Sequence, residues 1–138
     1  MPVIQNSINN VQVKFSSSVN NNVDQRIIEA LKKVVKNNIA FGYALNEIFI
    51  SSANDQHQSP SRHVQGNGKA IDISRINAMK MSVFYPNNAA VKAIVEAMQL
   101  EFENYVHRRE NYGPYLKKKH GNDQAVPGHA DHIHFSVN

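Results

Sequence analysis

The chain has 138 residues and a mass of 15.5 kDa, which predicts a single domain over residues 1–138. With 41% hydrophobic and 19% charged residues it is too balanced for a disordered chain, and no apolar run is long enough to span a bilayer. Cysteine is absent, which excludes disulfides, a thiol nucleophile and cysteine-bound zinc, and the net charge of +4 favours anionic partners.

The first part of the chain predicts a short strand followed by a helix. Val11, Val13 and Phe15 alternate with polar residues, which is typical of a strand. Asp24 is a residue type that caps helices, and apolar side chains recur behind it at helical spacing, at Ile27, Ile28, Leu31, Val34 and Val35. We therefore expect a helix that begins after Asp24 and ends near Asn37.

The middle of the chain predicts strands on both sides of a long polar loop. Residues 47–51 form a compact β-rich run and indicate a central strand. Residues 52–69 have no hydrophobic periodicity, and a loop of that length in a small domain is usually functional or mobile. Strand character resumes at residues 70–73, and a further strand is expected over residues 79–85.

The last part predicts a second helix and two strands. Residues 86–88 open the helix, and one apolar stripe, which we interpret as core, follows at Val91, Ile94, Val95, Met98, Phe102 and Tyr105. Strands are expected over residues 112–116 and 132–137. Because helices do not alternate regularly with strands, the order indicates an α+β fold with an antiparallel sheet.

Two segments hold the residues that indicate metal chemistry. Asp72 lies between two isoleucines and His134 lies between Ile133 and Phe135, so each polar side chain faces away from the core. If these two strands are neighbours, both side chains reach one ion, and His63 can fold over as a third ligand. One carboxylate and two imidazoles suit a catalytic zinc site that keeps one position for water.

Two further residues lie beside the predicted ligands. Asp131, at the start of the terminal strand, is the best candidate for the general base that takes a proton from water. Strict alternation would turn Asp131 away from His134, so we expect it where the strand begins or bends. His132 shares the exposed face and can donate to a carbonyl oxygen or oxyanion. Taken singly, each of these residues is more often an ordinary loop or strand residue, so the hypothesis depends on their combination.

In that combination the sequence resembles the zinc D-Ala-D-Ala carboxypeptidase family, which also includes D,D-dipeptidases and the L-alanyl-D-glutamate endopeptidases of phage lysins. The first family motif is matched by Ser61, His63, Gly66, Ala70 and Asp72. The second is matched by Asp131, His132 and His134. The motif-bearing core covers about residues 48–138.

The resemblance implies one Zn²⁺ ion bound by His63, Asp72 and His134, with Asp131 as the catalytic base and His132 as an accessory polarising residue. It also implies the small Hedgehog/D,D-peptidase-like fold, in which an antiparallel sheet carries its helices on one face. The implied activity is that of a zinc metallopeptidase that hydrolyses peptidoglycan stem peptides, as a phage-type endolysin or a virion-associated lysin.

The sequence departs from the family pattern in two places. His63 and Asp72 are nine residues apart, a longer spacing than the family uses, and His57 is a fallback ligand. The arginine that many members carry after the central strand is missing here, which leaves Asn54, Gln56 and Arg62 as candidate substrate or oxyanion donors. These departures motivate the alternative of a catalytically weak or inactive wall-binding or virion structural module.

Expectations for partners and location follow from the same residues. Residues 1–6 lack the charged start and apolar run of a secretory signal, so we expect synthesis in a host cytoplasm and action at the bacterial wall. We expect a monomer that binds peptidoglycan, with anionic wall polymers as further partners and without membrane insertion. The basic run at residues 117–120 leaves a nucleic-acid-binding domain open, but a solvated face also explains it and no specific nucleic-acid partner is expected.

Overall fold

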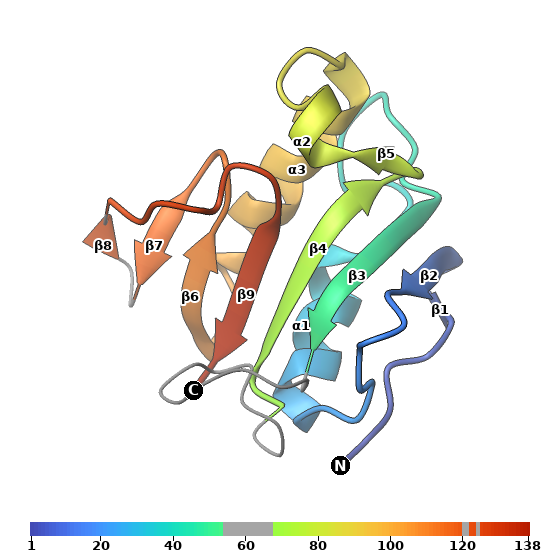
Figure 1. The fold of residues 1–138 in the computed structure, drawn as a ribbon, viewed down its shortest axis with the longest axis vertical. Coiled ribbons are helices and arrows are strands. Elements are labelled where there is room, and N and C mark those ends of the chain that lie inside the picture. Colours follow the sequence, from blue (N-terminus) through green and yellow to red (C-terminus); the bar gives the residue numbers. More distant parts are fainter. Residues whose placement is uncertain (54–67, 120–121, 124) are drawn as a thin grey trace.

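The structure is a computed structural model that describes residues 1–53, 68–119, 122–123 and 125–138 (Figure 1). In chain order its elements are β1 (Ser7–Ile8), β2 (Val11–Phe15), α1 (Gln25–Val34), β3 (Glu47–Ala53), β4 (Ala70–Ile76), β5 (Met79–Lys80), α2 (Met81–Phe84), α3 (Ala89–Phe102), β6 (Arg108–Tyr112), β7 (Lys117–Lys119), β8 (Asn122–Asp123) and β9 (Ile133–Val137). The fold is α+β, as predicted, with one sheet and a few helices.

The sheet is mixed, which corrects the prediction of an antiparallel sheet. Its order is β1-β2-β3-β4-β9-β6-β7-β8, with β5 paired to β4, and every pair is antiparallel except β2 and β3. The helix α1 lies between β2 and β3 in the chain, so the connection crosses over the sheet and returns parallel to β2. β4 and β9 are direct neighbours inside the sheet.

The two longer helices, α1 and α3, lie on the same side of the sheet (Figure 1). The side chain of Asp24 accepts a hydrogen bond from the Arg26 backbone N–H at 2.9 Å, which caps α1 as predicted. The side chain of Asn88 accepts one from the Val91 backbone N–H at 3.1 Å and caps α3. The buried stripes of both helices pack onto one apolar core.

The core is formed by the helices and the inner face of the strands. Ile71, Ile73, Ile133 and Phe135 are fully buried, and the rings of Phe102 and Phe135 lie 4.1 Å apart between centroids. The outer face of β4 and β9 therefore holds the alternating polar residues, as the sequence predicted. No helix among the described ranges is long and apolar enough to cross a membrane.

Two predicted strands differ from the observed elements. Residues 79–85 form the two-residue strand β5 and then the helix α2. The strand predicted over residues 112–116 is instead β6, which begins at Arg108. Its polar residues face both sides of the sheet, because Asn111 turns inward and bonds to Gln99 while Glu110 turns outward, so no hydrophobic alternation marks it.

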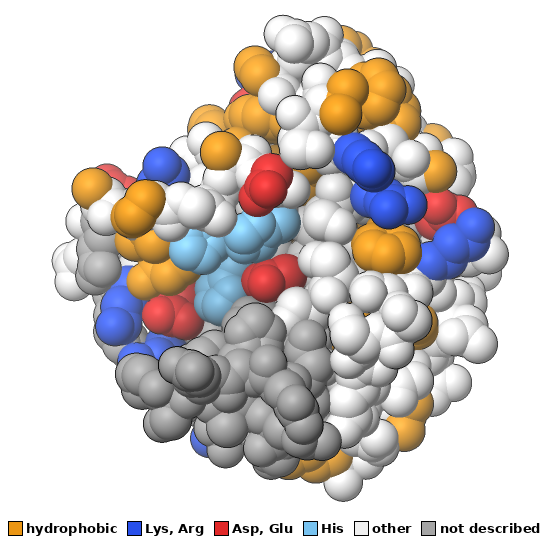
Figure 2. Space-filling view, in the orientation of Figure 1, with side chains coloured by type: hydrophobic (Ala, Val, Ile, Leu, Met, Phe, Trp, Pro, Cys, Tyr) orange, Lys and Arg blue, Asp and Glu red, His pale blue; other side chains and the backbone are white. Residues whose placement is uncertain are grey.

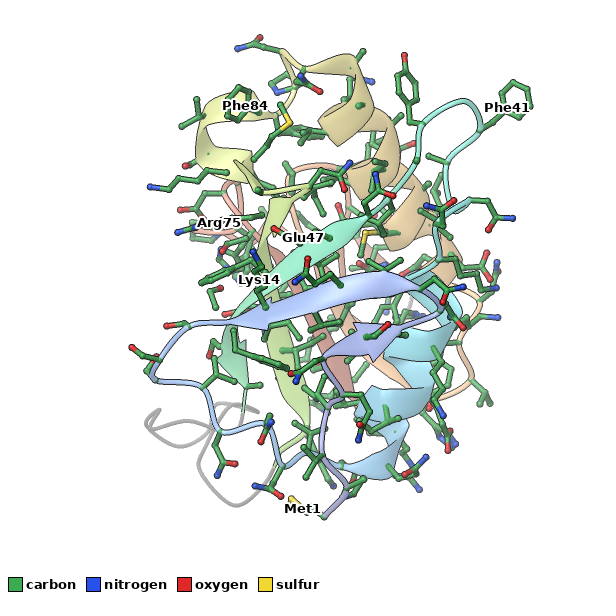
Figure 3. All side chains as sticks on the ribbon, turned by 90° about the vertical axis from the view of Figure 1, so that its right-hand side faces the viewer. Met1, Lys14, Phe41, Glu47, Arg75 and Phe84 are labelled. Carbon is green, nitrogen blue, oxygen red and sulfur yellow. The ribbon has the colours of Figure 1, made fainter. Side chains whose placement is uncertain are left out.

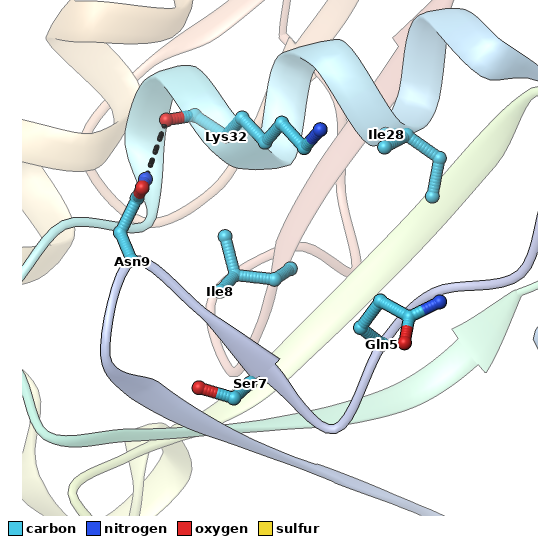
Figure 4. A pocket seen from close by; sticks show the side chains of 6 residues that line it. All are labelled: Gln5, Ser7, Ile8, Asn9, Ile28 and Lys32. Atoms are coloured by element: carbon cyan, nitrogen blue, oxygen red, sulfur yellow. Dashed lines mark hydrogen bonds between the residues drawn. The ribbon is translucent and has the colours of Figure 1, made fainter.

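A pocket lies between the β1 region and α1 (Figure 4). It is lined by Gln5, Ser7, Ile8, Asn9, Ile28 and Lys32. The side-chain amide of Asn9 donates to the backbone carbonyl of Lys32 at 2.9 Å. The lining contains no histidine or carboxylate, so the pocket offers no general acid or base.

Candidate metal centre

Asp72 and His134 are direct cross-strand partners on the outer face of the sheet. Their strands pair so that Asp72 lies opposite His134, between the inward-facing pairs Ile71–Phe135 and Ile73–Ile133. Oδ1 of Asp72 is 2.9 Å from Nδ1 of His134. The pairing of β4 with β9 therefore brings these two side chains into contact, as the sequence predicted, and no loop residue is needed for that contact.

The other nitrogen of His134 faces a second carboxylate. Nε2 of His134 lies 3.1 Å from Oε1 of Glu110, and the Ser136 hydroxyl donates to the same oxygen at 2.9 Å. Burial alone would lower the pKa of His134, but its hydrogen bonds to Asp72 and Glu110 raise that pKa to about 9. Burial raises the pKa of Glu110, and the bonds from His134 and Ser136 outweigh it and lower the pKa to about 2.

His132 connects Asp131 to this pair. Nδ1 of His132 lies 2.8 Å from Oδ1 of Asp131, and Nε2 of His132 lies 3.9 Å from Oδ1 of Asp72. Asp131 precedes β9, where the chain bends, and its side chain is 62% exposed. A carboxylate in this position is open to solvent and directs the His132 ring toward Asp72.

A third histidine packs against these rings. The His129 ring lies 4.9 Å from the ring of His132 and 5.6 Å from that of His134, between centroids. Burial lowers the pKa of His129, and the neighbouring His132 and His134 lower it further. The Tyr112 ring stacks on His134 at 5.5 Å, and burial followed by the nearby Glu110 raises the pKa of Tyr112.

The groups together form one ionisable patch on the open side of the sheet. Figure 2 shows histidine side chains gathered there with acidic side chains beside them. Hydrogen bonds link Asp131 to His132, and link Asp72 through His134 to Glu110. Nε2 of His132 lies 3.9 Å from Oδ1 of Asp72, an ion-pair distance that connects the two groups. This continuity matters because a proton or a cation placed at one member changes the interactions of every other member.

The pair of Asp72 and His134 fits a divalent metal. Ligand distances of ~2.0–2.2 Å in a tetrahedral site place two donor atoms roughly 3.3–3.6 Å apart. The observed 2.9 Å between Asp72 Oδ1 and His134 Nδ1 is shorter than that separation by about half an ångström. A metal ion in place of the proton between these atoms would need only a small movement of either side chain. Within the described part of the chain, no group of three or more His, Cys, Asp or Glu is arranged to hold a metal.

Several predicted residues lie outside the described ranges. These are Asn54, Gln56, Arg62 and His63, together with the fallback ligand His57. The described ends of that segment are nevertheless informative. Ala53 pairs with Ile71 and Ser52 pairs with Asp72, so the chain leaves the sheet directly beside the predicted carboxylate ligand.

Sequence reasoning missed three residues of the patch. Glu110 and Tyr112 alternate on β6 and both face outward, but the predicted strand began too late to include that alternation. His129 lies in the same C-terminal segment as His132 and His134 and had no role assigned to it. Its ring contacts depend on the turn before β9, which no spacing rule describes.

No protein-family model, no curated protein and no solved structure matches this chain. The function must therefore be argued from the chemistry of the site itself.

Proposed function

We propose that this protein is a zinc metallopeptidase that hydrolyses peptide bonds in the stem peptides of bacterial peptidoglycan, as a cell-wall lysin of the phage or virion-associated type. The single observation that supports it most is the pairing of Asp72 with His134 through Nδ1, on the open face of the sheet. His63 would complete the ligand set from the segment that begins beside Asp72.

Asp72 and His134 have the donor atoms for the zinc ion that this activity would require. A zinc ion bound there would act as a Lewis acid and lower the pKa of a water molecule to roughly 7. Asp72 and His134 would supply one carboxylate oxygen and one imidazole nitrogen, both partly shielded from solvent. The shielding strengthens their interaction with a cation and with charge that develops on a substrate.

Asp131 and His132 would handle the protons. Asp131, whose exposed carboxylate bonds to His132, would accept a proton from water and return it to the leaving amine. Because Nδ1 of His132 donates to Asp131, its Nε2 donates to a substrate carbonyl oxygen only when the ring carries both protons. In that form His132 stabilises negative charge on the carbonyl oxygen.

The test combines metal content with cleavage of purified peptidoglycan. The wild-type protein is expected to bind one equivalent of Zn²⁺ and to release new amino groups from wall peptides. Asp72→Ala and His134→Ala are expected to lose both properties together. His107→Ala is the matched control. His107 lies just before the first residue of β6, whereas Tyr112 is the last residue of that strand. Wall-peptide cleavage by either metal-free variant would refute the mechanism.

The alternative is a weak or inactive wall-binding or virion structural module on the same fold. It is favoured by the course of the chain after the central strand, where β3 continues as Ser51, Ser52 and Ala53 and supplies no arginine. This alternative predicts full zinc occupancy and co-sedimentation with walls, without release of amino groups from several wall chemotypes. Its net charge of +4 would then serve adhesion to anionic wall polymers.

A further inference from the structure

We propose that Glu110 is a positioning residue that holds the imidazole of His134 in the tautomer and orientation required for metal binding. The inference rests on the proposed function, because it concerns the same cation. It adds a residue on β6 to a site that the two sequence motifs place on β4, β9 and the segment before β4.

The tautomer follows from the hydrogen-bond partners. A carboxylate can only accept hydrogen bonds, so the contact of 3.1 Å between Glu110 Oε1 and His134 Nε2 requires the proton to be on Nε2. A neutral imidazole protonated at Nε2 has its lone pair on Nδ1. That nitrogen is the one that faces Asp72 at 2.9 Å. Glu110 therefore selects the form of His134 that presents a lone pair to a cation shared with Asp72.

Glu110 is itself held on both sides of its carboxylate. The Ser136 hydroxyl donates to Oε1 at 2.9 Å, and the Tyr112 hydroxyl donates to Oε2 at 3.4 Å. The backbone N–H of Glu110 also donates to the Ser136 hydroxyl oxygen at 3.1 Å. These bonds are built into the pairing of β6 with β9, in which Glu110 lies opposite Ser136 and Tyr112 lies opposite His134.

The measurement is the dissociation constant for Zn²⁺, obtained by competition with a chelating dye. Glu110→Ala is expected to weaken zinc binding by about 10–100-fold, the range typical for loss of a carboxylate that supports a histidine ligand. Glu110→Gln keeps an acceptor oxygen and is expected to recover part of the affinity. Ser136→Ala removes only the donor that anchors Glu110 and is expected to have a smaller effect.

A spectroscopic readout separates positioning from simple stabilisation. In the zinc-loaded protein, long-range ¹H–¹⁵N correlations of His134 are expected to show a protonated Nε2, and Glu110→Ala is expected to alter them. Glu103→Gln is the matched control: the Glu103 side chain is 20% exposed against 16% for Glu110, but its carboxylate faces Asn111 and Arg108 instead of the site.

The outcomes separate this inference from the proposed function. Wild-type zinc affinity in both Glu110 variants, beside lost affinity in His134→Ala, would overturn the role of Glu110 and leave the metal site intact. Unchanged affinity in His134→Ala as well would overturn both. An equal loss of affinity in Glu103→Gln would show a general effect of stability and would also overturn the positioning role.

A second and independent observation concerns Arg75, whose guanidinium lies over the Phe49 ring at 4.3 Å from its centroid. Arg75 pairs with Phe49 on β3 and with Lys80 on β5. Figure 3 shows Arg75 on the side of the sheet away from α1 and α3. Neither Arg75 nor Lys80 forms an ion pair with a carboxylate among the described residues. The guanidinium thus lies on the Phe49 ring, and no carboxylate of the described residues neutralises its charge.

Arg75 shares the outer face with Asp72. Ile71, Ile73 and Ile76 of β4 are fully buried, and the pairing with β3 shifts register between Ile73 and Arg75, which turns Arg75 outward. Arg75 lies three positions along the strand from Asp72, a distance of roughly 10 Å. We infer that Arg75, aided by Lys80, binds a free carboxylate of the peptide substrate, about two or three residues from the bond that is cleaved. This rests on the proposed function.

The test uses a wall stem peptide with free side carboxylates and its amidated twin. Binding is measured by NMR titration of the metal-free protein, so the result does not depend on hydrolysis. The wild-type protein is expected to prefer the acidic peptide by about tenfold, the value of one charge-assisted hydrogen bond at a partly exposed site. Arg75→Gln is expected to lose that preference, and Arg75→Lys is expected to keep part of it.

Lys36→Gln is the control. It removes a cation just after the end of α1, and α1 does not lie on the outer face that carries Arg75. Equal binding of both peptides by the wild-type protein would overturn the carboxylate subsite. An unchanged preference in Arg75→Gln would overturn it as well. Either result would leave the zinc and cleavage measurements on Asp72 and His134 unaffected, so the failure of this inference differs from failure of the proposed function.

Discussion

The strand β6 carries two polar clusters that face opposite sides of the sheet. On the inner side, the buried amide of Asn111 bonds to Gln99 and Glu103, with its side-chain nitrogen 2.7 Å from the Gln99 carbonyl oxygen and 2.7 Å from a Glu103 carboxylate oxygen. On the outer side, the neighbouring Glu110 bonds to His134 and Ser136. The two clusters differ in charge, exposure and freedom to exchange partners.

The inner cluster is built mainly from amides that satisfy one another. Oε1 of Gln99 accepts from the backbone N–H groups of Tyr115 and Leu116, and its Nε2 donates to Asn111 and to the Leu116 carbonyl. Such a network has one arrangement and serves to fix the turn after β6 against α3. The outer cluster consists of ionisable groups on the side of the sheet away from the core, and the side chains of Asp72, His134 and Glu110 are 10–17% exposed. We expect these groups to exchange a proton for a cation without unfolding of the protein.

The largest expected effect concerns the outer cluster. Asp72→Asn preserves the shape of the side chain but removes its charge, so we expect the Zn²⁺ affinity and peptidoglycan cleavage to fall by at least about 100-fold. The free energy of unfolding of the metal-free protein is expected to change far less than the activity. Isothermal titration with Zn²⁺ and chemical denaturation check the two parts. A parallel loss of stability and zinc affinity would contradict the distinction between the clusters.

The inner cluster should show the opposite pattern. Asn111→Ala removes two hydrogen-bond contacts from the buried Gln99 and one from the partly exposed Glu103, and we expect a loss of about 2–4 kcal/mol in the free energy of unfolding. Zinc affinity of the remaining folded protein is expected to stay within about twofold, because Asn111 faces away from His134. Urea denaturation measures the loss. A stability loss below about 1 kcal/mol would mean that the amide network contributes little.

The pH dependence of the metal-free protein should report the outer cluster. The pKa of His134 is raised from 6.5 to about 9, so its stabilising contribution is fully present below pH 6.5 and is lost as the pH rises through 9. The pKa of Glu110 is lowered from 4.5 to about 2, so its contribution is present above pH 4.5 and is lost as the pH falls through 2. Both shifts reflect one shared interaction, and we expect a plateau of stability between pH 4.5 and 6.5.

Zinc should remove the alkaline limb of this profile. When a cation replaces the proton at Nδ1, deprotonation of His134 no longer weakens its bond to Asp72. Thermal denaturation with and without Zn²⁺ between pH 6 and 10 checks this expectation. His134→Gln is the control and is expected to flatten the profile of the metal-free protein over the same range. A wild-type profile that Zn²⁺ leaves unchanged would contradict the metal site.

The smallest expected effect comes from a partly exposed ion pair within one helix. Lys92 and Glu96 are one helical turn apart on α3, with Nζ 2.9 Å from Oε2, and the Lys92 side chain is half exposed. Lys92→Ala is expected to change the free energy of unfolding by only about 0.3–0.5 kcal/mol, because water and salt screen such pairs. Denaturation at low and high salt measures it. A larger change would mean that exposure is a poor guide to the strength of ion pairs in this protein.

The sequence predicted side-chain orientation correctly on β4 and β9, where alternation decides the outcome. Asp72 and His134 each lie between core residues, and this pattern alone places them on the outer face. It predicted less where turns decide the outcome. Asp131 was expected where the strand begins or bends, and it lies in the bend before β9, but its bond to His132 follows from a turn conformation that spacing does not encode.

The helices were similarly accessible to sequence reasoning. Asp24 and Asn88 mark the starts of α1 and α3, and the apolar stripes behind them pack on the core. The end of α1 was less accurate, because the helix stops at Val34 while the apolar residue Val35 continues the pattern outside it. Burial continues past the last helical residue, so periodicity overestimates the length of the helix.

The amino-acid sequence by itself determined which side chains face the core, where the two long helices begin, and that Asp72 and His134 point to the same side as neighbouring polar residues. These are local properties, set by periods of two and 3.6 residues. Only the tertiary structure decided that β2 and β3 run parallel and that β9 lies between β4 and β6. Strand order brings Glu110 to His134 from 24 residues away, and no local pattern specifies such a contact because it depends on how the whole sheet is assembled.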